Sequence, residues 1–299
     1  MDAFEPRPTA AVDYWFWKFH VDDLAFLVDV ILRRPSGRAE VRVSQWLGGV
    51  GRVIHAETTE WSAGADRVAV GPTELRPGRC AGAADDVTWD LRWDDGGTIV
   101  TPLHGPLARL EPFDTTILAW PLARFEGSVT VGDRRFDVRD IPGAFYHYWG
   151  RGLSSRWVWL SATSFEDEPN RRLEAIVAIR SRLLGGPVYP IPLGFVWSTD
   201  GERSDLTVST VNGLVRTRPI PGGIAIDSAR LGGPRHQVRA TWGEVLPNDI
   251  GEGIVQTMHA DVAVDDHPGV AGTAGLETRA WPSIGAVVAM PRSVPSSPG

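Results

Sequence analysis

The chain has 299 residues, of which 42% are hydrophobic, and its 30 basic and 37 acidic side chains give a net charge of −7. This length allows one large or two smaller domains with sizeable cores. A nucleic-acid-binding protein normally shows a basic surplus or stripe, and the sequence shows neither. The single cysteine, Cys80, excludes an internal disulfide and a cysteine-rich metal site, and it favours a reducing compartment.

The N-terminal sequence, Met-Asp-Ala-Phe-Glu-Pro, lacks the basic start and apolar core of a signal peptide. The first apolar run, residues 24–32, contains Asp29 and follows Asp22 and Asp23. It is too short and too charged to span a bilayer. We therefore expect a cytoplasmic protein without an integral membrane segment.

Short runs rich in aromatic and β-branched residues follow one another along the first part of the chain. In one of them Val41 and Val43 alternate with charged or polar residues, which is typical of a strand. Residues 78–82 around Cys80 are interpreted as a loop, in which Arg79 could lower the pKa of the thiol. The pattern predicts an antiparallel meander with strands at residues 14–20, 24–34, 39–47, 50–56, 66–70, 87–93 and 98–103.

A second series of strands follows the stretch 124–139, in which Gly132-Asp133 is a turn pair of the hairpin kind. Residues 173–184 fit a short helix or a strand, and the run Ile176-Val177-Ala178-Ile179 favours a strand. The sequence thus predicts an all-β protein with two β domains in tandem, over residues 1–123 and 124–285. A Ser/Pro-rich tail at 286–299 is expected to be disordered.

The segment 143–165 concentrates one histidine, two tyrosines and three tryptophans between glycines. Large aromatic side chains can hold a lipophilic ligand, while a histidine and two phenols can move a proton. Side chains alternate along a strand, so a ligand faces either His147 with Phe145 and Trp149, or Tyr146 and Tyr148, but not both sets.

Structural roles are the alternative for the residues of this segment. His147 could instead satisfy a buried backbone carbonyl beside the turn at Gly150. Trp157 and Trp159 share one face of the next strand, where they could pack in a core or line a ligand site.

The run Gly143-Ala-Phe-Tyr-His-Tyr-Trp-Gly150, followed by Trp157-Val-Trp159, resembles the Gly-x-x-x-His-x-Trp-Gly and Trp-x-Trp pattern of hydroxyneurosporene synthase (carotenoid 1,2-hydratase) and tocopherol-cyclase-like proteins. Residues 125–132 and 272–277 are also similar to that family. The resemblance implies two lipocalin-like β-barrels or half-barrels, with a ligand pocket at their junction. It further implies a hydratase, cyclase or pericyclase for terpenoid, polyene or polyketide-derived substrates, working without metal or organic cofactor.

In the carotenoid hydratases a Tyr-x-Asp pair acts with the His and Trp of the motif to protonate an alkene. The comparable strand of this chain, residues 173–181, contains no Tyr-x-Asp. The resemblance therefore favours cyclisation or isomerisation over hydration.

Other candidate residues lie outside this segment. His55 and Glu57 share one strand face and form either an acid–base couple or surface partners for Arg52 or Arg67; with no third ligand in register, they do not indicate a metal site. Glu277 lies on a late strand between glycines, as a pocket carboxylate or as an arginine partner. Glu174 and Asp261 interrupt apolar strands in the same way.

We thus expect a cofactor-independent biosynthetic enzyme that binds a lipophilic substrate between the barrels and catalyses its cyclisation or isomerisation, including a pericyclic reaction, by substrate folding and acid or hydrogen-bond catalysis. A hydratase, a non-catalytic carrier of lipophilic ligands and a carbohydrate-binding module are the alternatives, and a homo-oligomer is left open. An enzyme should place titratable groups with perturbed pKa values in the cavity, whereas a carrier cavity could be wholly apolar. The expected catalytic residues are His147, Glu277, Tyr146 and Tyr148, and the expected substrate-binding residues are Phe145, Trp149, Trp157, Trp159, His55 and Glu57.

Overall fold

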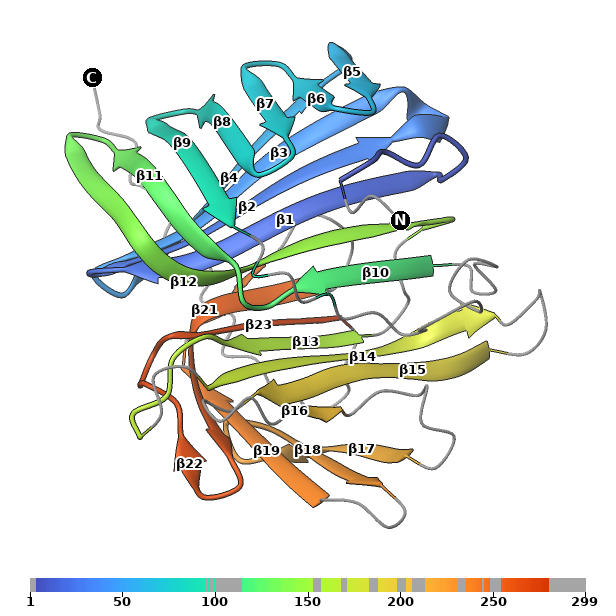
Figure 1. The fold of residues 1–299 in the computed structure, drawn as a ribbon, viewed down its shortest axis with the longest axis vertical. Coiled ribbons are helices and arrows are strands. Elements are labelled where there is room, and N and C mark those ends of the chain that lie inside the picture. Colours follow the sequence, from blue (N-terminus) through green and yellow to red (C-terminus); the bar gives the residue numbers. More distant parts are fainter. Residues whose placement is uncertain are drawn as a thin grey trace, which may run out of the picture.

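The computed structural model describes residues 4–94, 96, 99, 115–152, 157–167, 171–182, 188–197, 203–205, 213–230, 235–243, 245–247 and 254–279. Almost all of these residues lie in two antiparallel sheets, as the sequence predicts (Figure 1). The part of the chain described here contains no helix long and apolar enough to cross a membrane.

The first sheet curls into a nearly closed barrel. Its strands run in the order β4-β3-β2-β1-β12-β11-β9-β8-β7-β6-β5, and β10 also pairs with β12. The indole N–H of Trp61 donates to the carbonyl oxygen of Gly37 at 2.9 Å, which ties the last strand of the sheet to the turn between β2 and β3. The strands are β1 (Val12–Val21), β2 (Leu24–Arg33), β3 (Arg38–Leu47), β4 (Val50–Thr58), β5 (Trp61–Gly64), β6 (Arg67–Val70), β7 (Thr73–Arg76), β8 (Arg79–Ala84), β9 (Val87–Asp94), β10 (Thr115–Trp120), β11 (Arg124–Val131) and β12 (Arg134–Gly150), with the 3-10 turn η1 (Arg34–Ser36) after β2.

The second sheet forms a half-barrel beneath the first in Figure 1. Its order is β16-β15-β14-β13-β23-β21-β19-β18-β17, and β20 and β22 pair with β21. Together the two sheets make a tandem lipocalin-like fold. The strands are β13 (Trp157–Ala162), β14 (Arg172–Arg182), β15 (Val188–Trp197), β16 (Arg203–Asp205), β17 (Gly213–Ile220), β18 (Gly223–Arg230), β19 (Arg235–Trp242), β20 (Leu246–Pro247), β21 (Ile254–Val264), β22 (His267–Pro268) and β23 (Ala274–Arg279).

The first sheet continues past residue 124, the predicted start of the second domain. The hairpin β11–β12 turns at Gly132-Asp133, as predicted, but it pairs with β9 and β1 of the first sheet. The reason is the length of β12: its 17 residues pair with β11 near the start and with β1 near the end. The second sheet begins with β13, so the division lies between Gly150 and Trp157. The predicted tail, 286–299, and, apart from residue 99, the predicted strand 98–103 lie outside the described residues.

The segment around Cys80 is a strand and not the predicted loop. Cys80 lies in β8 and is fully buried, and it accepts a hydrogen bond from the Trp89 indole at 3.2 Å. Burial raises the pKa of the thiol, opposite to the predicted effect of Arg79. The small residues of β8 hide the alternation of apolar and polar side chains that would predict a strand. At Gly82 a small residue is required, because a Cβ there would lie 2.5 Å from the Trp89 ring.

Strand alternation divides the buried aromatic side chains between two cores. Trp15, Trp17 and Phe19 of β1 point into the first barrel. Tyr14 and Phe16 of the same strand point outward, into a second core shared with the half-barrel. This shared core joins the first barrel to the half-barrel and contains the candidate site.

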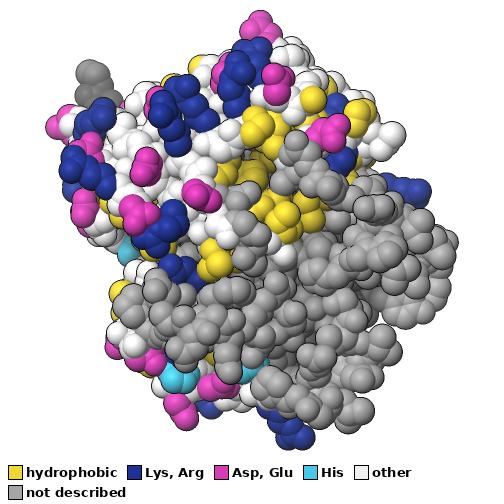
Figure 2. All heavy atoms as spheres, in the orientation of Figure 1, with side chains coloured by type: hydrophobic (Ala, Val, Ile, Leu, Met, Phe, Trp, Pro, Cys, Tyr) yellow, Lys and Arg dark blue, Asp and Glu magenta, His cyan; other side chains and the backbone are white. Residues whose placement is uncertain are grey.

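The outer strands of the first barrel carry charges of both signs on the face shown in Figure 2. Arg67 pairs with Glu74 and Arg79 pairs with Asp90, with N–O distances of 2.6 and 3.0 Å. Exposed pairs of this kind contribute little to stability. They intersperse basic and acidic groups over this part of the surface.

Candidate active site between the two sheets

The aromatic segment of β12 presents its two candidate sets to opposite sides, as alternation requires. Tyr146 and Tyr148 face the half-barrel, and Phe16 of β1 stacks on the Tyr146 ring with centroids 4.1 Å apart. Phe145 and Trp149 point into the first barrel with His147. The structure therefore separates His147 from the tyrosines by the thickness of the sheet.

His147 is fully buried inside the first barrel. Its Nε2 lies 2.7 Å from Oδ1 of Asp13, and its ring stacks on Trp15 with centroids 4.6 Å apart. Asp13 also accepts from the backbone N–H of Arg7 and from the Arg34 guanidinium. A buried side-chain carboxylate therefore contacts this histidine.

A four-residue polar cluster joins the two sheets on the Tyr146 side. The Tyr146 hydroxyl donates to Oε2 of Glu174 at 2.5 Å, and the Ser161 hydroxyl donates to Oε1 of the same carboxylate. Lys18 of β1 donates from Nζ to the Ser161 carbonyl oxygen at 2.6 Å. All four side chains are buried, so two strands of each half meet around one carboxyl group.

Burial brings the pKa values of Glu174 and Lys18 close together. Loss of solvent raises the pKa of Glu174 to about 7, although Lys18 and the two hydroxyl donors act against the rise. Loss of solvent also lowers the pKa of Lys18 to about 8, against the opposing effect of Glu174. The pKa of Tyr146 is raised well above its ordinary value by burial and by the neighbouring carboxylate. Glu174 can therefore exchange a proton near neutral pH.

A second phenol–carboxyl pair lies on the same face. The Tyr14 hydroxyl donates to Oδ1 of Asp29 at 2.8 Å, and Nη1 of Arg42 lies 3.6 Å from Oδ2 of that carboxyl. Burial raises the pKa of Asp29 to about 6. It also raises the pKa of Tyr14, and the charges of Asp29 and Glu277 add to that rise. Glu277, one of the predicted catalytic residues, lies on β23 and accepts from the Trp157 indole at 2.8 Å.

Some side chains between the sheets keep a little accessible surface, while Tyr146 has none. Trp15 and Trp17 inside the first barrel have none. By contrast, 5–8% of the surface is accessible for Tyr14, Phe16, Trp157, Trp159 and Ile176. These side chains keep a little accessible surface on the side of the sheet that carries both phenol–carboxyl pairs. Predicted residues Trp157 and Trp159 thus lie in the shared core with Tyr146 and Tyr148.

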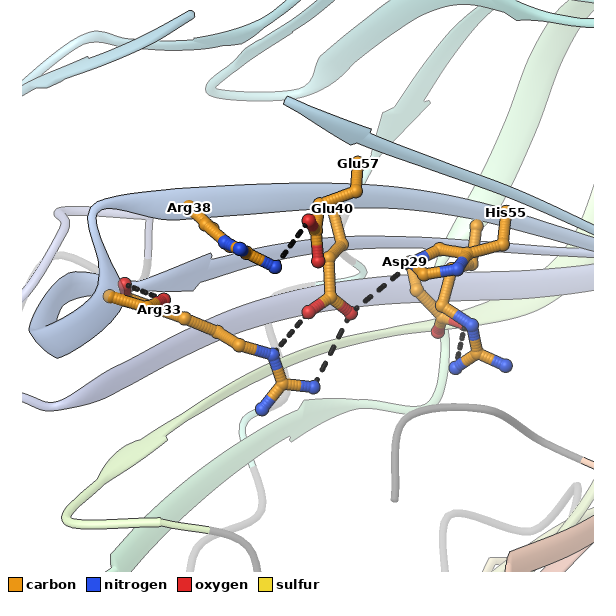
Figure 3. A network of polar contacts seen from close by, with 8 residues as sticks. Asp29, Arg33, Arg38, Glu40, His55 and Glu57 are labelled. Atoms are coloured by element: carbon orange, nitrogen blue, oxygen red, sulfur yellow. Dashed lines mark hydrogen bonds and ion pairs between the residues drawn. The ribbon is translucent and has the colours of Figure 1, made fainter. Parts of the chain in front are cut away.

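The predicted residues His55 and Glu57 lie at the edge of this face, on β4. His55 Nε2 lies 3.6 Å from Oε2 of Glu40, which is also bound by Arg33 (Figure 3). Glu57 pairs with Arg38 at 2.8 Å and is substantially exposed. Neither makes the predicted contact with Arg52 or Arg67, which pair with Asp85 and Asp86 and with Glu74.

Sequence reasoning left Lys18, Asp29 and Arg42 out of the site. The signal was present: Lys18 stands between Trp17 and Phe19, and Asp29 interrupts the apolar run 24–32. A charged residue in such a run is buried only with a partner, so it marks a polar cluster. Glu174, considered only as one of several strand carboxylates, is the group on which the cluster converges. The described residues include no group of three His, Cys, Asp or Glu side chains that could hold a metal ion.

Comparison of the sequence with known proteins finds two partial relatives. No family model matches the chain. Two uncharacterized proteins of Mycobacterium tuberculosis, MT0513 and Rv0493c, are each 28% identical over 145 residues, covering 43% of this chain. The match spans 44% of the length of either relative.

Solved structures match over nearly the whole chain. A protein assigned as AttH from Nitrosomonas europaea is 13% identical with a TM-score of 0.62, covering 92% of this chain and 94% of that one. Kievitone hydratase from Nectria haematococca is 13% identical with a TM-score of 0.59, covering 92% and 90%. CghA, solved with Sch210972, is 11% identical with a TM-score of 0.60, covering 90% and 88%. At these identities the likeness establishes the shared two-sheet fold, and function has to be argued from the site.

Proposed function

We propose that this chain is a cofactor-independent biosynthetic enzyme that binds a lipophilic substrate between the two sheets and cyclises or isomerises it by acid and hydrogen-bond catalysis. The observation that carries the proposal is the Tyr146–Glu174 pair, in which a buried carboxyl group has a pKa of about 7. It lies on the same side of the sheet as the aromatic side chains of Tyr14, Phe16, Trp157 and Trp159, called the aromatic wall below. Side chains with strongly shifted pKa values in a desolvated site are candidates for acid–base catalysis.

Cyclisation or isomerisation involves no net gain or loss of protons, so it needs a group that can both give and take a proton, as Glu174 can. Near neutral pH it is present in both protonation states, so it can give a proton to one end of a substrate and take one from another. The hydroxyls of Tyr146 and Ser161 stabilise its ionised form, and Lys18 balances the charge. Tyr14 and Asp29 supply a second hydrogen-bond donor and acid on the same face.

The aromatic wall supplies shape and charge stabilisation. Trp159 meets the stacked Phe16 and Tyr146 rings edge-on, at 5.8 and 5.7 Å. Rings fixed in this way can hold a flexible polyene or terpenoid in a folded conformation, which lowers the entropic barrier to ring closure. Their faces also stabilise a developing cation. We assign Glu277, Tyr148 and Trp157 to the accessible end of this site, and His147, Phe145 and Trp149 to packing inside the first barrel.

Hydration is the second candidate. It is favoured by the fold shared with kievitone hydratase, and the same acid could protonate an alkene or carbonyl while water adds. The missing Tyr-x-Asp on β14 argues against the route of the carotenoid hydratases. A lipid carrier would need the aromatic wall but not a carboxyl group poised near neutrality.

Product mass separates these functions. Purified protein would be incubated with a panel of linear terpenoids, polyenes and polyketide-like ketones, followed by liquid chromatography and mass spectrometry. A new product of unchanged mass supports cyclisation or isomerisation, a gain of one water supports hydration, and tight binding without conversion supports a carrier. Tyr146→Phe and Glu174→Gln should each lower turnover by roughly a hundredfold or more, while the exposed control Arg67→Met should not. Full turnover in Glu174→Gln would contradict the proposal.

A further inference from the structure

Arg42 is a buried cation whose donors are not satisfied. Its side chain has no accessible surface, and within the described part of the chain none of its three guanidinium nitrogens makes a hydrogen bond. Its ion pair with Asp29 spans 3.6 Å, beyond hydrogen-bond distance. A buried guanidinium in this state is costly unless an oxygen acceptor occupies the space in front of it.

Within the described residues neither acidic neighbour of Arg42 accepts a hydrogen bond from it. Asp29 accepts from Tyr14, and Glu40 accepts from Arg33 and lies beside His55 (Figure 3). Asp29 Oδ2 itself has no hydrogen bond within the described residues. The donors of the Arg42 guanidinium are therefore available to an oxygen acceptor that a bound molecule supplies.

The position of Arg42 fits the polar end of a molecule lying in the shared core. Its same-face neighbour Ser44, two residues further along β3, accepts from Gln256 of β21 at 2.5 Å, so the half-barrel crosses β3 next to it. On the other side its charge acts on the Tyr14 phenol, which belongs to the partly accessible aromatic wall. Phe16 of β1 stands opposite Asp29 of β2, and Asp29 stands opposite Arg42 of β3, so a ligand lying against Phe16 and directed across these strands would point towards the guanidinium.

We infer that Arg42 forms a carboxylate subsite and that the preferred ligands of this protein are lipophilic acids, their chain against Phe16 and Trp159 and their carboxylate on the guanidinium. The planar fork of arginine matches two carboxylate oxygens, and such charge-assisted bonds are the strong ones in a desolvated site. The inference rests on the proposed binding of a lipophilic substrate between the sheets, and it adds the class of that substrate.

Fluorescence titration with cis-parinaric acid and its methyl ester tests the subsite. The two probes share one polyene chain and differ only in the carboxylate. Wild-type protein should bind the acid roughly tenfold to a hundredfold more tightly than the ester. Arg42→Met should abolish this preference, Arg42→Lys should reduce it because the fork is lost, and the exposed control Arg79→Met should keep it. Equal affinities in the wild type, binding of neither probe, or a preference retained by folded Arg42→Met would overturn the inference.

Two further measurements keep the outcome interpretable. If Arg42→Met does not fold, the double variant Asp29→Asn with Arg42→Met removes both partners of the pair and should restore folding without the acid preference. Turnover separates this inference from the proposed function. Conversion of neutral substrates without acid preference would contradict the carboxylate subsite but not the enzyme proposal. Acid preference without any conversion would contradict the enzyme proposal but not the subsite.

Discussion

Tyr146 and Glu174 lie on different sheets, and the phenol hydroxyl of the first donates to the carboxyl group of the second at 2.5 Å. The contact joins the aromatic segment of β12 to β14, 28 residues further along the chain. Because both side chains are fully buried, the bond couples the packing of the two halves to the protonation of one carboxyl group.

This coupling predicts a pH dependence of stability. The pKa of Glu174 rises from 4.5 to about 7 on folding, so the folded state binds the proton more tightly. Its contribution is therefore complete below about pH 4.5 and is lost as the pH rises towards 7, by up to about 3 kcal/mol. Urea unfolding at several pH values should show wild type losing up to this much stability relative to Glu174→Gln, which cannot ionise at this position, as the pH rises over this range. A difference that is independent of pH would contradict the raised pKa.

His147 should prove to be a stability residue. His147→Ala leaves the buried Asp13 with one partner fewer and opens a cavity beside Trp15. We expect a loss of roughly 2–4 kcal/mol in the free energy of unfolding, with unchanged parinaric acid affinity in the folded protein. Weakened ligand binding without loss of stability would instead restore His147 to the functional site.

Gly275 should control the space beside Trp159. A Cβ at this position would lie 2.8 Å from the Trp159 ring and 2.9 Å from the Met258 sulfur. Gly275→Ala should therefore displace the ring, cost roughly 1–3 kcal/mol of stability and weaken ligand binding. Gly243→Ala, where a Cβ meets nothing within 4 Å, is the matched control. Equal ligand affinity in the two variants would show that the Trp159 position is unimportant.

Cys80 should be unreactive in the native protein. It is fully buried under the Trp89 indole, and burial raises the pKa of its thiol. Labelling with a thiol reagent should follow unfolding, with native protein protected and protein in concentrated urea labelled at once. Rapid labelling under native conditions would mean that β8 opens readily.

The sequence was sufficient for the fold class, for most strands and for the rule that His147 and the tyrosines face opposite sides. Alternation is a local property of a strand, so it can be read from Phe145 to Trp149 alone. Which side faces the second sheet depends on pairing between β12 and β1, more than a hundred residues apart, and no local pattern encodes it.

The same limit explains the missed residues. Lys18, Asp29 and Glu174 each stand alone in an apolar strand, and their pKa values arise only when two sheets remove water from all of them. The sheet to which β12 belongs is set in the same way: β12 is one uninterrupted strand, and its membership of the first sheet follows from pairing and not from composition.

The most direct test of the central claim is a crystal structure of the protein soaked with parinaric acid. We predict ligand density between the two sheets, with the chain against Phe16 and Trp159 within reach of the Tyr146–Glu174 pair. Density confined to the interior of the first barrel, beside His147 and Trp149, would contradict it.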